Sequence, residues 1–429
     1  MSEARIYLDN NATTRPCAAA VAAVRRGVEE LWGNPSSVHR TGQAARRAME
    51  LARAQVAALL GCKPAELVFT SGGTEANRIA LEGVLGLATR RGQPAVLLTT
   101  PVEHAAVREP AAALEAAGVR VVRLPVDGDG VLDPADLAAA FAAASGSAAA
   151  LASVHWANNE TGVVQPIEAL AAVAAEAAAA RTATTRFHTD ATQAVGKLPV
   201  DLGGSLGGVS SGGASSGCAS SGGGSLAGVD LLTLAGHKLH GVKGTGALFV
   251  RRRVRLAPVA TGGPQERGLR AGTENLAGVL ALGAAAEEAG AFLRDPAATA
   301  AVAARRDRFE AAVLAAVPGS VVPAAGARRG RLPNTTNLAF PGLLAEAILL
   351  GLSERGVDAS AGAACSSGSL EPSPVLLAMG LPEELAHGSV RFSLSRHTTD
   401  AELDAAVEAL AATVGRLGAL RPLGVESAG

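Results

Sequence analysis

The chain has 429 residues, of which 48% are hydrophobic and 18% are charged. This supplies a large buried core and carries too little charge for a disordered chain. The 38 basic and 39 acidic residues give a formal net charge of -1, so the overall charge does not favour binding to nucleic acid or to an anionic membrane. At this length we expect two or more domains, or one large domain with an appendage.

Segments with strand and helix patterns alternate through the first 260 or so residues. The expected strands are residues 66–70, 95–99, 120–124, 150–154, 231–234 and 246–250. The expected helices are residues 42–60, 74–90, 105–117 and 166–180. This alternation predicts an α/β fold with a mostly parallel sheet and helices on both faces. Ligands of such sheets bind beyond the carboxyl ends of the strands.

A different pattern follows residue 265. A helical region at 275–317 precedes short strands at 337–340, 357–360 and 390–393, and a last helix at 400–417. We expect a large domain at residues 14–265 and a smaller α+β domain made of residues 1–13 and 266–429. Between two strands of the large domain, residues 203–228 contain 11 Gly and 8 Ser. This composition predicts a flexible insertion, which we interpret as a tolerated surface loop.

The four cysteines, Cys17, Cys62, Cys218 and Cys365, are far apart in the sequence and form no Cys-x-x-Cys pair. A cysteine-based metal site or a disulfide framework is therefore not expected. The first residues are charged and lack the apolar stretch of a secretory signal. No segment of about 20 residues has the uninterrupted apolar character of a membrane span. We expect a cytoplasmic protein.

The strongest motif lies at residues 230–246, where an apolar strand leads into Gly236-His237-Lys238 and a glycine-rich turn. A lysine at such a strand end can lose its proton and attack a carbonyl to form a Schiff base. A single lysine is more often a solvated surface residue. The assignment of Lys238 therefore depends on its neighbours.

Those neighbours are the polar residues that follow other strands. A buried Asp190 facing a pyridine nitrogen would keep that nitrogen protonated and make the ring an electron sink, and Gln193 could donate to a phenolic oxygen. The N–H groups of Gly73 and Thr74 would form a phosphate cradle at a helix N-terminus. His104 could stack on a flat ring or transfer protons. Taken singly, the glycine motif could be an ordinary helix cap and His104 a packed histidine.

Together these motifs resemble the cysteine desulfurases of class V of the pyridoxal-phosphate aminotransferase superfamily, and most of all the nitrogen-fixation and iron–sulfur-cluster branch. Outside the Gly/Ser segment the resemblance covers almost the whole chain. Its motifs are residues 7–14, 33–37, 69–75, 156–162, 188–193, 236–238, 265–275, 332–335 and 390–395. It implies fold type I, with a mostly parallel seven-stranded sheet in the large domain. It also implies a homodimer, and pyridoxal 5'-phosphate as the cofactor.

The resemblance assigns a role to each residue of the cofactor site. Lys238 would bind the cofactor covalently and then act on the substrate proton, and Asp190 would pair with the pyridine nitrogen. Gln193 would bind the ring oxygen, and His104 would lie over the ring as a further catalytic residue.

The remaining binding roles concern the phosphate and the substrate. The phosphate would be held by Gly73, Thr74 and His237, and by Thr273 from the partner subunit. Asn159 would contact the cofactor, and with Arg391 would hold the substrate carboxylate, for which arginine offers a two-pronged donor.

Cys365 lies among small residues in Ala-Gly-Ala-Ala-Cys-Ser-Ser-Gly-Ser. Such a sequence is typical of a mobile loop, from which a nucleophile can reach the substrate and then transfer the bound group to an acceptor. The resemblance implies that Cys365 attacks the sulfur of L-cysteine and becomes a persulfide, which leaves L-alanine as the product. No resident metal is expected, although Cys365 could transiently contact a nascent iron–sulfur cluster. Cys17, Cys62 and Cys218 are expected to be inert.

Two positions depart from the family pattern. The cysteine loop lacks one hydroxyl that the family usually carries, and Ala235 stands where a phosphate-binding serine is common. Neither change removes a reacting group. A selenocysteine lyase or another β-lyase on this fold remains an alternative, as does a non-catalytic sulfur-transfer scaffold. The sulfur acceptor is expected to be an iron–sulfur scaffold or another acceptor protein.

Overall fold

The computed structural model describes residues 5–180, 183–203, 226–324, 326–327, 330–361 and 371–419. Cys365 and Cys218 lie outside these residues, as do residues 204–225 of the Gly/Ser segment. The predictions made for them are therefore not tested by the structure.

A seven-stranded sheet forms the centre of the larger part of the molecule, in the order β2-β8-β7-β6-β5-β3-β4. Only β8 runs antiparallel to its neighbours, which confirms the predicted mostly parallel α/β sheet. The strands are β2 (Leu67–Thr70), β3 (Ala95–Thr99), β4 (Arg120–Arg123), β5 (Ala149–Ser153), β6 (Thr184–Asp190), β7 (Leu231–Ala235) and β8 (Gly246–Val250).

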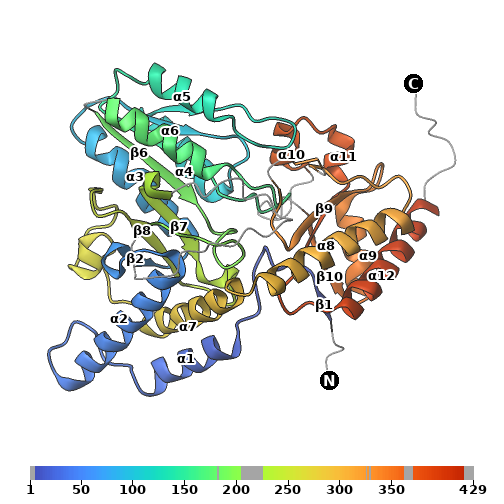
Figure 1. Ribbon diagram of the computed structural model, residues 1–429, viewed down its shortest axis with the longest axis horizontal. Helices are drawn as coiled ribbons and strands as arrows, with labels where there is room; N and C mark the ends of the chain where they lie inside the picture. The colour runs from blue at the N-terminus through green and yellow to red at the C-terminus, as the bar shows by residue number, and fades with distance from the viewer. Residues whose placement is uncertain are drawn as a thin grey trace.

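Helices cover both faces of this sheet (Figure 1). Strands β3, β5, β7 and β8 are short and almost wholly apolar because both of their faces are buried. One face packs on α3 (Gly73–Thr89) and α4 (Ala105–Ala116). The other packs on α1 (Ala18–Glu29), α2 (Arg40–Leu60), α5 (Pro134–Ala143), α6 (Ile167–Ala180) and α7 (Leu276–Leu293). No prediction from the sequence covered α1 or α5.

The smaller part of the molecule lies beside the large sheet, at the right of Figure 1. A three-stranded antiparallel sheet has the order β11-β12-β9, and β1 pairs with β10 in parallel. The strands are β1 (Ile6–Tyr7), β9 (Thr335–Ala339), β10 (Val357–Asp358), β11 (Ser360–Ala361) and β12 (Ser389–Ser393). The helices are α8 (Pro296–Ala316), α9 (Ala345–Glu354), α10 (Pro374–Ala378), α11 (Glu383–His387) and α12 (Asp400–Ala419).

The helical region expected at 275–317 is two helices, because Asp295 and Pro296 interrupt it. Asp295 Oδ1 accepts hydrogen bonds from the N–H groups of Ala297 and Ala298, at 3.0 and 3.2 Å. Pro296 occupies the first position of α8, where its missing N–H costs nothing. The two helices also pack differently: α7 lies against α1 and α2 on the large sheet, and α8 lies in the smaller part. The expected domain boundary at residue 265 stays a prediction.

Among the described helices, α7 alone has the length and mean hydropathy of a membrane span. Its apolar side chains Leu276, Val279, Leu282 and Ala286 belong to the core between the sheet and α2. Packing in the core accounts for their apolar character.

The last residues of the Gly/Ser segment differ from the flexible loop predicted for them. Leu226–Gly228 form a 3₁₀ turn. Leu226 is buried against the core, and its carbonyl accepts a hydrogen bond from Arg251 Nη2 at 3.1 Å. A Cβ at Gly228 would lie 2.4 Å from the carbonyl oxygen of Ala171 in α6. Leu226 and Gly228 are therefore packed against the core and α6. The prediction of a flexible loop is wrong for residues 226–228.

A buried ion pair joins α2 to the turn Gln265–Gly268. Arg53 and Glu266 make two short hydrogen bonds, of 2.9 and 2.6 Å, and their side chains are only 8% and 2% exposed. We expect Arg53→Met to lower the free energy of unfolding by about 3–5 kcal/mol, because Glu266 would keep a buried, unpaired charge. Arg78→Met, which breaks an exposed pair with Glu82, should cost at most about 1 kcal/mol. Urea unfolding of the two variants measures the difference, and equal losses would contradict this role.

Candidate active site

A cavity of about 350 Å³ opens at the carboxyl ends of the parallel strands. The loops after β2, β3, β5, β6 and β7 meet there, as the strand order requires. Most of the site residues predicted from the sequence line this cavity: Gly73, Thr74, His104, Asn159, Asp190, Gln193, His237, Lys238 and Arg391. Segments more than 300 residues apart therefore contribute to one site.

Asp190 is the last residue of β6 and is 6% exposed. Its Oδ2 accepts a hydrogen bond from the amide of Asn77 at 2.7 Å, and its Oδ1 accepts one from the N–H of Thr192 at 3.0 Å. The carboxylate is thus held in one orientation at the bottom of the cavity by donors to both oxygens. Asn77 is fully buried on α3. No sequence prediction included it, although it lies on the same helix as Gly73 and Thr74.

Lys238 ends the 3₁₀ turn Gly236–Lys238, which follows β7 directly. Its Nζ donates to the main-chain oxygens of Asn11 and Ala12, at 2.5 and 2.7 Å. Gly241 has room only for a hydrogen atom, because a Cβ there would lie 2.8 Å from the oxygen of Gly236. The glycine-rich turn therefore folds back on itself and directs Lys238 toward the cavity.

The N-terminus of α3 provides the anion-binding end of the cavity. The first N–H groups of a helix, here those of Gly73 and Thr74, have no partner within the helix and attract an anion. His237 also lines this cavity, and its Nδ1 lies 3.1 Å from Thr13 Oγ1. Burial, together with the charge of Lys238, lowers the pKa of His237 to about 4. At neutral pH it can therefore bind an anion as a neutral hydrogen-bond donor.

Two histidines line the cavity beside these groups. His104 is the N-cap of α4, and its Nδ1 accepts a hydrogen bond from the N–H of Ala106 at 3.0 Å. The ring is therefore fixed with its proton on Nε2. His155 was not predicted from the sequence. It is 4% exposed, and its Nδ1 lies 3.2 Å from Oε1 of the fully buried Glu103.

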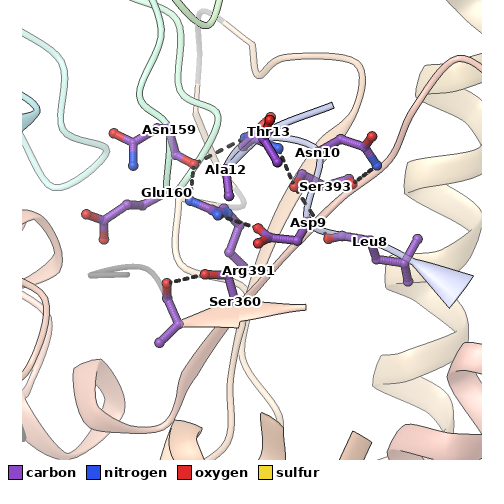
Figure 2. A network of polar contacts seen from close by, with 12 residues as sticks. Leu8, Asp9, Asn10, Ala12, Thr13, Asn159, Glu160, Ser360, Arg391 and Ser393 are labelled. Carbon is purple, nitrogen blue, oxygen red and sulfur yellow. Dashed lines mark hydrogen bonds and ion pairs between the residues drawn. The ribbon is translucent and has the colours of Figure 1, made fainter. Parts of the chain in front are cut away.

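Arg391 comes from β12 of the smaller part and lines the cavity. Figure 2 shows the polar contacts that hold it. Its Nη2 donates to Asp9 Oδ1 at 2.6 Å, and its Nη1 donates to the main-chain oxygen of Asn159 at 3.1 Å. Its Nε is buried and has no hydrogen-bond partner among the described residues. Nη1 and Nη2 each carry a second N–H, and Arg391 lines the cavity, so its guanidinium is suited to bind a small carboxylate.

Two predicted residues are not brought into the cavity by the described part of the chain. Thr273 is exposed on the loop before α7 and does not line it. Cys365 lies outside the described residues.

A buried histidine behind the site should make stability depend on pH. His188 of β6 lies between Ser153 Oγ and Thr233 Oγ1, at 2.9 and 3.1 Å, and burial lowers its pKa to about 4. Between its ordinary value of 6.5 and about 4, the unfolded chain takes up a proton that the folded chain does not. The free energy of unfolding should therefore fall as pH drops through this window, by up to about 1.4 kcal/mol per pH unit from this residue.

The comparison of wild type with His188→Gln tests this effect. The variant should lose part of the pH dependence of the urea midpoint. The rest should remain, because His237 and His240, whose pKa values are also lowered to about 4, still contribute to it. An unchanged pH dependence in His188→Gln would contradict the assignment.

Comparison with known proteins agrees with this geometry. The profile of the aminotransferase class-V family matches residues 6–205 and 225–406, on either side of the Gly/Ser segment. Cysteine desulfurase 2 of Trichormus variabilis is 45% identical over 99% of this chain and 96% of its own length. Cysteine desulfurase NifS of Azotobacter vinelandii is 43% identical over 98% of this chain and 95% of its own length.

Solved structures show the same fold. A NifS-like protein superposes with a TM-score of 0.80 at 30% identity, and covers 96% of this chain and 100% of that one. A structure described as SspA in complex with cysteine has a TM-score of 0.72 at 30% identity, and covers 92% of this chain and 99% of that one. These matches confirm the fold type expected from the sequence motifs. The chain belongs to the aminotransferase class-V family, on the branch of that family that includes the cysteine desulfurases.

Proposed function

We propose that the protein is a pyridoxal 5'-phosphate-dependent cysteine desulfurase. It removes sulfur from L-cysteine, releases L-alanine and carries the sulfur as a persulfide on Cys365. The observation that carries the proposal is the meeting of Lys238, Asp190 and an anion-binding helix N-terminus around one cavity. The near full-length relatives named above, which are cysteine desulfurases, support the same reaction.

The residues of the cavity fit this cofactor at each of its chemical groups. The N–H groups of Gly73 and Thr74 would hold the phosphate, with His237 as a neutral donor. A Cβ at Gly73 would lie 3.0 Å from Thr192 Oγ1, so a larger residue would fill this cradle. The buried carboxylate of Asp190 would pair with the ring nitrogen. Pyridoxal phosphate, when bound, supplies an electron sink for the bonds that break at the substrate.

The chain's own residues supply the other requirements of the reaction. Lys238 would attach the cofactor and then hold and move the proton of the substrate α-carbon. The unused donors of Arg391, with the side chain of Asn159, would orient the substrate carboxylate. His104, with its proton fixed on Nε2, would lie over the ring.

The sulfur step belongs to Cys365. Its thiolate would attack the substrate sulfur, forming an S–S bond as the C–S bond breaks. The electron pair of the broken bond would stay on the three-carbon fragment, which takes up a proton and leaves as L-alanine. The persulfide would then pass to a sulfur acceptor, which we propose is an iron–sulfur scaffold or another acceptor protein.

The direct test is to incubate the purified protein, loaded with pyridoxal phosphate, with L-cysteine. We expect L-alanine and sulfide in equal amounts when a thiol reductant is present. Without reductant, mass spectrometry should find one added sulfur on the peptide that contains Cys365. Turnover of selenocysteine without turnover of cysteine would instead indicate a selenocysteine lyase, and the absence of both would leave a scaffold role.

We further propose that the protein is a homodimer. Apolar side chains on α1, on the connection to α2 and on α2 are unusually exposed, among them Trp32 at 74% and Val38 at 88%. A patch of this kind marks an interaction surface. A second copy of the chain would cover it, and could bring the exposed Thr273 to the neighbouring cofactor site. Light scattering at known concentration measures the mass, and a monomer at micromolar concentration would contradict the proposal.

A further inference from the structure

A second lysine, Lys197, lies at the edge of the site and has no role in the proposed reaction. It is partly buried, four residues after Gln193. Its Nζ lies 2.6 Å from Gln193 Oε1 and 3.1 Å from Asn11 Oδ1. Burial and the charge of Lys238 lower its pKa well below the usual value. Because both partners are oxygens that accept, Lys197 donates to them in either protonation state.

This contact and a second one to Asn11 together decide which way the Gln193 amide faces. A glutamine amide has an acceptor oxygen and a donor NH₂, and two opposite orientations fit the same space. The main-chain oxygen of Asn11 can only accept, so the side of the amide that faces it is the NH₂. The amide oxygen therefore faces Nζ of Lys197, which donates to it. The NH₂ then points away from Lys197, and one of its hydrogens is donated to the main-chain oxygen of Asn11 at 2.9 Å. Its second hydrogen remains available toward the cavity that Gln193 lines.

Asn11 joins this pair to the reactive lysine. Asn11 is 1% exposed, and its main-chain oxygen accepts from both Gln193 Nε2 and Lys238 Nζ. Its side-chain amide donates to Thr335 Oγ1 at 2.9 Å, while its side-chain oxygen accepts from Lys197. Lys197 therefore contacts both Gln193 and Asn11, and the main-chain oxygen of Asn11 accepts from Gln193 and from Lys238.

We propose that Lys197 is a positioning residue, which fixes the Gln193 amide with its NH₂ toward the cavity so that it can donate to the ring oxygen of pyridoxal phosphate. This inference rests on the proposed function. If Lys197 is lost, only the main-chain oxygen of Asn11 still holds the amide, and orientations that present its oxygen to the negatively charged ring oxygen become populated. The hydrogen bond is then replaced by a repulsive contact.

The test measures cofactor binding rather than turnover. The dissociation constant of pyridoxal phosphate and the visible absorption band of the bound cofactor are measured for wild type, Lys197→Met, Gln193→Leu and the double variant. We expect Lys197→Met and Gln193→Leu each to weaken binding about three- to tenfold, the effect of one net hydrogen bond. Both should shift the band in the same direction. The double variant should bind no more weakly than Gln193→Leu, because the two residues act as one unit.

Two further variants separate positioning from general effects. Lys197→Arg keeps a donor-only side chain and should restore binding to within about twofold of wild type, a difference below the energy of one hydrogen bond. Lys63→Met removes a positive charge from an exposed lysine that does not line the cavity and should leave binding unchanged. If Lys197→Met does not fold, Lys197→Gln replaces it with the same expectations, because its amide no longer forces one orientation on Gln193.

These measurements separate the role of Lys197 from the proposed function of the protein. The role of Lys197 would be overturned if the double variant lost affinity by the product of the two single losses, or if Lys197→Met bound the cofactor as wild type does. The proposed function would still stand. Failure of the wild-type chain to bind pyridoxal phosphate at all would overturn the proposed function, and this inference with it.

Discussion

Replacing Lys238 with Ala is expected to lower the rate of alanine formation from cysteine by about 10³-fold or more, because the variant lacks both the attaching amine and the base. In the structure Nζ of Lys238 is held by two main-chain oxygens at the cavity. Lys197, the other amine close by, is bound to Gln193 and Asn11. Borohydride reduction followed by mass spectrometry should find the cofactor attached to Lys238 in wild type and to no residue of the variant.

Lys243→Ala is the matched control for this experiment, because it removes an exposed lysine from the same glycine-rich segment. It should retain wild-type activity and covalent cofactor. Covalent attachment that persists in Lys238→Ala at another lysine would show that a different amine carries the chemistry.

Replacing Cys365 with Ala is expected to abolish persulfide formation and to reduce release of sulfur from cysteine at least about a hundredfold, because no thiolate remains to attack the substrate sulfur. Cofactor affinity should not change, since no group that holds the cofactor is altered. The measurements are the sulfide and alanine yields, the mass of the Cys365 peptide, and the absorption of the bound cofactor.

The other described cysteines provide the controls. Cys17 and Cys62 are 8% and 1% exposed, and burial raises the pKa of both thiols, that of Cys62 to about 12. Neither thiol ionises at neutral pH, so Cys17→Ala and Cys62→Ala should keep full activity in the folded enzyme. Desulfurase activity that survives in Cys365→Ala would contradict the role of this residue and favour direct release of sulfur.

The mostly parallel sheet was predictable because its strands are short apolar segments separated by helical patterns. Expected and observed strands have the same bounds at 95–99 and 246–250. The region at 275–317 is helical as predicted, but the break at Asp295-Pro296 was not predicted, since the pattern of alanines continues across it. The helices α1 and α5 were not predicted. Their positions depend on packing against the sheet rather than on local preference.

The sequence by itself determined the chemistry of this site, because the reacting groups sit in short local motifs at strand ends. Lys238 after β7, Asp190 at the end of β6 and Gly73 at the start of α3 could each be read from their neighbours. The fold brings them together because parallel strands end at one edge of the sheet.

Only the tertiary structure decided how those groups are held. The donors that orient Asp190 and Gln193 come from Asn77 and Lys197, and Asn11 reaches the site from the N-terminal segment. Such side chains are common and carry no local signature. Their roles depend on distances and hydrogen-bond directions between segments far apart in the chain, which no sequence pattern specifies.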